Sequence, residues 1–334
     1  MKITDQKSLL TVCCVAYNQE TYIRDALESF VMQKTDFPFY VLIGDDASCD
    51  STPNIICEYA EKYPAIVKPI LRDENIGATR NSLDLYSRVD TKYVALCDGD
   101  DYWTDPNKLQ IQVDFLEKHK NFTICFHPVL AKWQDRTHED EILPPLKRIK
   151  NRNVFGFRDL LKGNVIYSSS VVFRWQLAGR SEIFPEDIVP GDWFLQLLHA
   201  WRGKVGFINK LMSVYRINHT SWETNTEDEI YRKYGYGILC FYDAVEKEFG
   251  ISQTKAKRRS VVKMFYPLPA MDIVKVLTKY PVLVPKVKRH YCINAVFYKM
   301  CSLLSFGASK KKFKGRFEES SSIVKLLDDT IKSF

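Results

Sequence analysis

The sequence lacks several features that mark particular classes of protein. No pair of its nine cysteines has zinc-site spacing, because Cys13 and Cys14 are adjacent, on opposite faces of a predicted strand. Cys97 and Cys125 lie inside apolar runs, which favours small core residues over a disulfide framework. The first residues are polar, and no secretory signal peptide, internal repeat or low-complexity segment is evident. We therefore expect a cytoplasmic globular protein.

Charge is distributed unevenly along the chain. The formal net charge is +7, yet residues 255–316 contain 16 Lys and Arg against one acid, Asp272, a balance of +15. The remainder must carry 7 − 15 = −8, so an acidic body precedes a basic tail. With 334 residues, the chain is also longer than most chains that fold around a single hydrophobic core. We predict a large domain over residues 1–224 and a helical, basic region over 225–334.

Short β-rich runs alternate with amphipathic helices up to about residue 130. The predicted strands span residues 9–16, 39–43, 66–71 and 92–97, and the predicted helices lie at 23–31, 52–63 and 78–89. This alternation predicts an α/β protein with a mostly parallel sheet flanked by helices on both faces.

The later elements are less regular. Asp105 and Pro106 predict the start of another helix, with Asp105 as its N-cap. The charged segment 133–152 indicates a long loop, which is often a lid or binding element. A strand is predicted over 168–173, a helix over 192–201 and a short strand over 205–208.

A dense acidic cluster, Asp98-Gly99-Asp100-Asp101, directly follows the apolar run 93–97. At the carboxyl end of a parallel strand, such carboxylates are suited to holding a divalent cation against phosphate oxygens. Taken alone, the cluster is also compatible with an acidic turn that caps the next helix.

Three other polar segments follow predicted strands. Tyr17 comes after the first strand and could stack on a nucleobase, although a core or capping tyrosine is the simpler alternative. The segment 44–52 offers carboxylates to a base or ribose. The segment 75–80 ends in Arg80, which could pair with a phosphate.

The order of these segments resembles the family-2 glycosyltransferases, inverting sugar-nucleotide-dependent enzymes with the Rossmann-like GT-A fold. The likeness covers about residues 8–222 and rests on four segments in the family's order, 17–20, 45–52, 75–80 and 98–103. The resemblance implies the following roles: base and ribose contacts for Tyr17 and Asp46, diphosphate contact for Arg80, metal binding for Asp98 and Asp100, and a shared donor-site role for Asp101.

An inverting transfer also needs a general base for the acceptor hydroxyl. Asp192, in Gly191-Asp192-Trp193, occupies the place where the family carries this acid, so we predict that it is the base. An ordinary helix N-cap is the alternative interpretation. Glu186 and Asp187 are the fallback candidates.

The segment 214–222 resembles the family's closing Tyr-Arg segment, although Thr220-Ser221 replaces the glycine-rich stretch usual there. His219 could reach the metal or diphosphate, or could be a surface or packing residue. Ser168, Ser169 and Ser170 resemble the acceptor-side strand and give a weaker signal.

The basic tail has two interpretations. Residues 291–306 form an apolar stripe between cationic clusters, too short and interrupted to span a membrane. Segment 286–316 could bind an anionic membrane surface, or its stripe could pack on the catalytic domain. No nucleic-acid-binding module is recognised.

Together these features predict a metal-dependent glycosyltransferase. The expected donor is a nucleoside-diphosphate sugar, a UDP-sugar by preference, bound with Mg²⁺ or Mn²⁺. The resemblance implies a glycan or lipid-linked acceptor in bacterial capsule or lipopolysaccharide synthesis, at the cytoplasmic membrane face. A nucleotidyltransferase is a weaker alternative, since residues 15–20 offer no basic phosphate-binding loop. A catalytically silent sugar-nucleotide or glycan-binding module is the other alternative, although it would most simply have a broken acidic motif.

Overall fold

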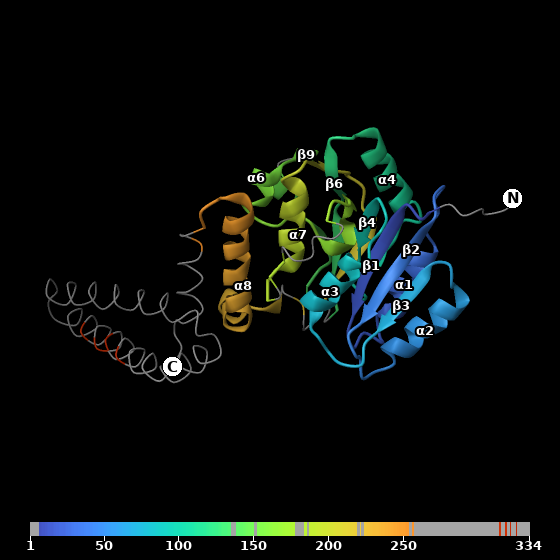
Figure 1. Ribbon diagram of the computed structural model, residues 1–334, viewed down its shortest axis with the longest axis horizontal. Helices are drawn as coiled ribbons and strands as arrows, with labels where there is room; N and C mark the ends of the chain where they lie inside the picture. The colour runs from blue at the N-terminus through green and yellow to red at the C-terminus, as the bar shows by residue number, and fades with distance from the viewer. Residues whose placement is uncertain are drawn as a thin grey trace. The chain divides into compact units, whose positions relative to one another are not determined.

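The computed structural model describes two units of the chain (Figure 1). The units are Met1–Thr224 and Asn225–Phe334, and each is considered by itself. The described residues are 7–134, 138–149, 152–177, 184–185, 187–218, 221, 224–253, 256, 314, 318, 321 and 325.

An eight-stranded sheet forms the centre of the first unit, in the order β3-β2-β1-β4-β10-β6-β11-β9. Its strands are β1 Leu10–Ala16, β2 Phe39–Asp45, β3 Val67–Leu71, β4 Tyr93–Leu96, β6 Phe122–Phe126, β9 Val154–Phe155, β10 Val172–Arg174 and β11 Lys204–Phe207. Strands β3, β2, β1 and β4 are parallel, whereas β10 runs against both β4 and β6. Strand β11 is parallel to β6, and β9 is antiparallel to β11. The predicted α/β class with a mostly parallel sheet is confirmed.

Helices cover both faces of this sheet, because alternate side chains of each strand point to opposite sides. The helices are α1 Ile23–Val31, α2 Thr52–Lys62, α3 Ala78–Ser87, α4 Lys108–Lys118, α6 Phe157–Leu160 and α7 Gly191–Ala200. Apolar residues of α1, α2 and α4 join one core cluster with Leu10, Val12 and Cys14 of β1. Cys13 and Val15 face the opposite side, where α3 packs on β1 and β2.

A second, four-stranded sheet has the order β5-β12-β7-β8. Its strands are β5 Tyr102–Trp103, β7 Val129–Trp133, β8 Glu141–Leu143 and β12 Ser213–Ile217. Strand β12 pairs antiparallel with β5 and parallel with β7. Since β5 directly follows the acidic cluster, this sheet reaches the functional edge of the larger one.

The prediction that 133–152 is one long loop is wrong in part. Strand β8 lies within it and pairs antiparallel with β7, and a short helix, α5 Leu146–Ile149, follows. Glu141 and Ile142 are exposed and only Leu143 is buried, so this strand has no clear apolar alternation.

Two other predicted boundaries are also corrected. Helix α4 begins at Lys108 with Asn107 as N-cap, because the Asp105 carboxylate accepts the Asn107 N–H at 2.8 Å in a turn before the helix. Residues 168–170 form a 3₁₀ turn, η1, ahead of β10. The Ser170 hydroxyl donates to the Tyr167 carbonyl at 2.7 Å, which favours that turn over a continuous strand.

The described part of the second unit is mainly α8, Glu227–Phe249. Thr226 and Glu229 form its capping box, and Gly250 ends it with a left-handed φ of 66°. Across the described residues, no helix combines the length and apolar character that a membrane crossing requires. Segment 286–316, apart from Lys314, lies outside the described residues, so its membrane interpretation stays a prediction.

Candidate active site

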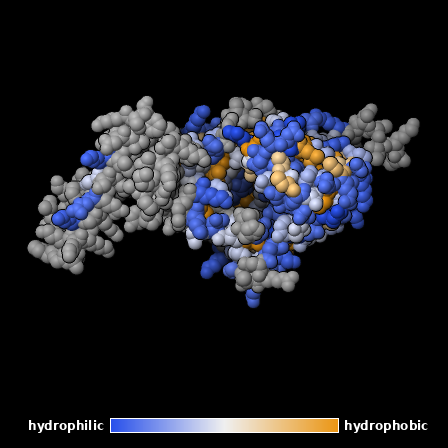
Figure 2. Space-filling view, turned by 90° about the horizontal axis from the view of Figure 1, so that it is seen from below, coloured by the Kyte–Doolittle hydropathy of each residue, from blue (hydrophilic) through white to orange (hydrophobic). Residues whose placement is uncertain are grey.

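A cavity of about 510 Å³ opens at the carboxyl ends of β1, β2 and β4. Seen from below, the surface is hollowed near its middle, where apolar side chains lie beside hydrophilic ones (Figure 2). The sequence-predicted residues that line this cavity are Tyr17, Asp46, Asp98, Asp100, Ser168 and Asp192. Arg80, Asp101 and Asp187 are described but are not among the lining residues.

The loops after β1 and β2 are joined by reciprocal hydrogen bonds. Asn18 donates its N–H to the Ser48 hydroxyl and accepts from the Cys49 N–H, both at 2.9 Å. Asn18 has φ 50°, a left-handed conformation that asparagine adopts more readily than most residues. Tyr17 is 48% exposed at this rim, so its ring is available to a planar ligand.

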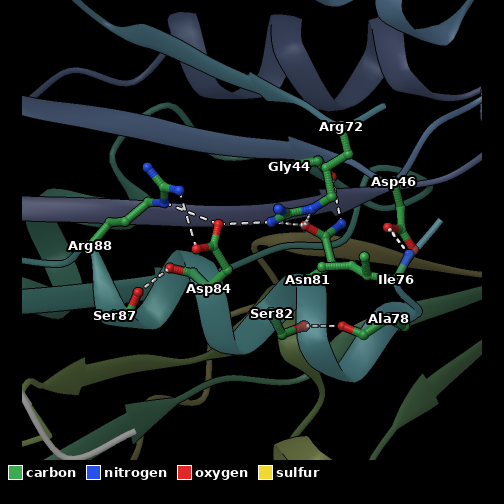
Figure 3. Close-up of polar contacts among 10 residues, drawn as sticks. All are labelled: Gly44, Asp46, Arg72, Ile76, Ala78, Asn81, Ser82, Asp84, Ser87 and Arg88. Carbon is green, nitrogen blue, oxygen red and sulfur yellow. Dashed lines mark hydrogen bonds and ion pairs between the residues drawn. The ribbon is translucent and has the colours of Figure 1, made fainter. Parts of the chain in front are cut away.

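Asp46 shapes the turn that leads into α3. Its buried carboxylate accepts the N–H group of Ile76 at 2.9 Å (Figure 3). It also accepts the N–H group of Gly77 at 2.9 Å, and Gly77 has φ 88°. Asn75 donates to the Asp46 carbonyl at 3.1 Å. Each carboxylate oxygen keeps a second lone pair, so Asp46 can anchor the turn and still accept from a ligand in the cavity.

Asn81 ties α3 to the sheet. Its amide donates to the Gly44 carbonyl at 2.8 Å, and its Oδ1 accepts from the Arg72 guanidinium at 2.9 and 3.0 Å (Figure 3). A Cβ at position 44 would lie 2.3 Å from Asn81 Oδ1, so only glycine allows this approach. Arg80, the residue predicted here from the sequence, precedes Asn81 and is exposed on α3.

Asp98 and Asp100 are half-buried and face the cavity. Burial, and then the nearby carboxylates of Asp100 and Asp192, raise the pKa of Asp98 to about 7, against a smaller opposing effect of the Ser168 hydroxyl. Burial also raises the pKa of Asp100. These are carboxylates for which the charged form is unfavourable until a cation approaches.

Asp101 is not among the residues that line the cavity and is only 1% exposed. Its Oδ1 accepts the Arg216 N–H of β12 at 2.8 Å. Burial, followed by Asp100 and Asp98, raises the pKa of its carboxyl well above the ordinary value. Its predicted donor-site role stays a prediction, and its contacts favour anchoring of the acidic turn.

The carboxylates of Asp98 and Asp100 suit a divalent cation whose remaining ligands come from the substrate. Within the described ranges, no group of three or more His, Cys, Asp or Glu side chains forms a metal cage. Mg²⁺ is commonly held by one or two carboxylates together with substrate phosphates, and the raised pKa of both acids suits that chemistry. Asn218, which was not predicted as a site residue, donates to Asp100 Oδ2 at 3.2 Å.

Asp192 lies in the first turn of α7 and borders the same cavity. The N-cap is Pro190, so the interpretation of Asp192 as the cap is wrong. Asn164 donates to Asp192 Oδ2 at 3.2 Å, and its own Oδ1 accepts the Ile166 N–H at 2.9 Å, which fixes the orientation of the amide. Asp187 is exposed, and the other fallback, Glu186, lies outside the described residues, as does His219.

Comparison with known proteins identifies the family. A family model described as "Glycosyl transferase family 2" matches residues 11–176. An uncharacterized protein of Mycobacterium tuberculosis is 41% identical over 239 residues, 71% of this chain and 67% of that protein. The chain belongs to glycosyltransferase family 2. The family resemblance stated from the sequence is thereby confirmed.

More distant relatives of this glycosyltransferase include the "dTDP-rhamnosyl transferase RfbG" of Shigella flexneri. RfbG is 24% identical over 268 residues, 74% of this chain and 82% of that protein. The "Minor teichoic acid biosynthesis protein GgaA" of Bacillus subtilis is 30% identical over 125 residues, 36% of this chain and 28% of that protein.

Solved structures agree with the fold of the family. S. aureus TarS 1–349 in complex with UDP has a TM-score of 0.53 at 16% identity, over 97% of this chain and 91% of that one. The mannosyltransferase PcManGT from Pyrobaculum calidifontis, in complex with GDP-Man and Mn²⁺, has a TM-score of 0.52 at 14% identity, over 96% and 88%. At these identities the likeness concerns the fold, and the predicted GT-A fold is confirmed.

Proposed function

We propose that this glycosyltransferase inverts the anomeric centre of a nucleoside-diphosphate sugar, a UDP-sugar by preference, as it transfers the sugar to a hydroxyl of a glycan or lipid-linked acceptor. One observation carries the proposal: a single cavity brings together the turn anchored by Asp46, the acid pair Asp98 and Asp100, and Asp192. A donor-binding surface, a cation site and a base thus share one edge of the sheet.

Each residue has a separate part in the proposed transfer. Asp98 and Asp100 hold a divalent cation, which supplies Lewis-acid stabilisation to the departing diphosphate. Asp192 accepts the proton of the acceptor hydroxyl, whose oxygen attacks the anomeric carbon as the bond to the diphosphate breaks. Asn164, which donates to Asp192 Oδ2, keeps that carboxylate directed at the cavity. A single displacement of this kind inverts the configuration.

The names of similar proteins support the setting. TarS is recorded with UDP and with UDP-GlcNAc, and the mannosyltransferase with GDP-Man and Mn²⁺. RfbG is named a rhamnosyl transferase and GgaA a teichoic acid biosynthesis protein. We therefore propose a role in bacterial surface polysaccharide synthesis, such as capsule or lipopolysaccharide, with Mg²⁺ or Mn²⁺ as cofactor.

The basic segment 286–316 is proposed to hold the enzyme at the cytoplasmic face of an anionic membrane, near a lipid-linked acceptor. Flotation of the full chain with anionic vesicles measures this directly. Binding should weaken steeply with salt, because surface charges are screened. Equal flotation with neutral vesicles would contradict the electrostatic docking.

A thermal-shift screen of UDP-, GDP- and dTDP-sugars with Mn²⁺ tests the donor assignment. A ligand at 100 times its dissociation constant should add about 2.7 kcal/mol of stability. Asp100→Asn should abolish the Mn²⁺-dependent part of that gain, while Asp114→Asn, an exposed acid on α4, should retain it. Stabilisation by none of the three donors would contradict the proposal, and donor binding without transfer to any glycan acceptor would favour a silent binding module.

A further inference from the structure

Arg216 of β12 reaches the acidic turn although it lies far along the chain. Its Nη1 donates to the Asp100 carbonyl at 2.8 Å, and its backbone N–H donates to Asp101 Oδ1 at 2.8 Å. Its Nη2 donates to the Asp25 carboxylate of α1. Arg216 is 8% exposed, so one buried guanidinium joins the small sheet, the acidic turn and α1.

Two aromatic rings fix the orientation of this guanidinium. The Arg216 Cζ atom lies 4.4 Å from the centroid of Tyr102 and 5.2 Å from that of Tyr22. Tyr102 belongs to β5, which pairs with β12 through Val214. Ring contacts and a planar fork of donors restrict arginine far more than a lysine ammonium would be restricted.

The hydrogen bonds of the Arg216 guanidinium distinguish two effects that this residue can have on the acidic turn, one through its charge and one through the shape of the turn. The guanidinium donates to the backbone carbonyl of Asp100, so the arginine does not occupy the carboxylate oxygens. A nearby positive charge repels a divalent cation, so charge alone would weaken a cation site. What Arg216 adds in favour of the site is therefore the fixed shape of the turn.

We infer that Arg216 is a positioning residue for the cation site: it fixes the acidic turn in the shape in which Asp98 and Asp100 present their carboxylates to the cavity. This inference deepens the proposed function and rests on its assignment of a cation to those two acids. Partners behind metal ligands orient them, and their loss typically costs about 10- to 100-fold in metal affinity.

The test compares Arg216→Lys, which keeps the charge, with Arg216→Gln, which removes it. Mn²⁺ titrations followed by electron paramagnetic resonance, without and with UDP, measure the cation affinity of each full-length variant. Both variants should bind Mn²⁺ about 10- to 100-fold more weakly than wild type. UDP affinity in EDTA should stay within about twofold, since the hydrogen bonds of Asn18 and Asp46 go to Ser48, Cys49, Ile76 and Gly77 and not to Arg216.

Arg174→Lys is a matched control. Arg174 also donates to backbone carbonyls, of Phe122 and Leu116, and lies 5.4 Å from the ring of Tyr93. It pairs with the first residue of β4, at the end of that strand opposite the acidic turn. Its substitution should therefore leave Mn²⁺ affinity unchanged.

The outcomes separate the explanations. Wild-type Mn²⁺ affinity in Arg216→Lys with tighter binding in Arg216→Gln would overturn the inference, since charge alone would then act. If the Arg216 variants do not fold, Asp25→Ala decides, because it removes the acceptor of Arg216 Nη2 and leaves Arg216 itself in place: a several-fold loss of Mn²⁺ affinity supports the inference and no loss overturns it. Absence of Mn²⁺ or UDP binding in wild type would instead count against the proposed function.

Discussion

The two halves of the cavity are built on opposite principles. On the side of the loops after β1 and β2, polar groups are satisfied within the chain, as the contacts of Asn18 and Asp46 show. On the side of the acidic turn, half-buried carboxylates lie together with raised pKa values. The hydrogen bonds of Asn18 and Asp46 are thus made without a ligand, whereas the acidic turn is the part of the cavity in which the proposed cation would balance charge.

This contrast has a physical consequence. A prebuilt hydrogen-bond framework loses little conformational entropy when a ligand binds, so it supplies orientation at low cost. Clustered carboxylates are unfavourable alone and become favourable with a cation, so they couple stability to that ion. The predictions below begin with the proposed base, Asp192, and then perturb each half in turn.

The largest effect is expected at Asp192. Asp192→Asn should reduce sugar transfer by about 10²- to 10⁴-fold, the usual cost of losing a general base. Donor binding should persist, since Asp46, Asp98 and Asp100 are all retained. Product formation with a purified acceptor measures the rate of sugar transfer, and calorimetry measures donor binding. Asp187→Asn, an exposed neighbour, is the control; a greater loss there than at Asp192 would move the base to Asp187.

A second prediction concerns pH. Because the pKa of Asp98 is raised to about 7, a cation must displace a proton from part of the molecules at neutral pH. Mn²⁺ affinity should therefore rise with pH and level off above that pKa, and fall by up to about tenfold per pH unit below it. Titrations between about pH 5.5 and 8 measure this.

Two measurements sharpen the comparison of the halves. UDP binding in EDTA should depend much less on pH, since the groups around Asn18 and Asp46 are already satisfied. Asp98→Asn should flatten what remains of the Mn²⁺ profile. An unchanged slope in that variant would assign the titration to another acid.

A smaller effect is expected at Asn81, whose hydrogen bonds are made within the chain. Asn81→Ala leaves the Gly44 carbonyl and the Arg72 guanidinium without this partner, which should lower the free energy of unfolding by about 1–3 kcal/mol. Nucleotide affinity should fall with it, while Mn²⁺ binding without nucleotide should persist. Chemical denaturation measures the stability. Ser87→Ala, which removes an exposed bond on the same helix, should change it by less than about 0.5 kcal/mol. Equal losses in both variants would argue against a special role for Asn81.

Much of the fold could be predicted because its strands are buried on both faces. Six of the seven residues of β1 are buried, so the strand reads as a continuous apolar run, and polar residues just beyond such runs fall at the ligand-binding edge. This logic placed Asp46, Asp98 and Asp100 at the cavity. Strand β8 was missed because its neighbour β7, and not a buried face, holds it in place.

The residues that position the site were harder to predict. Asn81 matters through Gly44 and Arg72, and Asn164 through Asp192, contacts that no local period encodes. The pairing of β12 with β5 decides the role of Arg216, and such non-local pairing follows from the assembled sheet rather than from propensity.

The late position of β12 in the chain determines which segments must be kept together when parts of this enzyme are exchanged with those of a relative. The bond from Arg216 to Asp101 joins residues 115 positions apart, whereas the family match ends at residue 176. A growing chain therefore displays its acidic turn well before the strand that braces it is synthesised. A chimera that receives only residues 11–176 of this chain contains Asp98, Asp100 and Asp101 but not Arg216, which contacts the acidic turn. The smallest transplantable unit that keeps both the acidic turn and its contacts with Arg216 must therefore extend past residue 216.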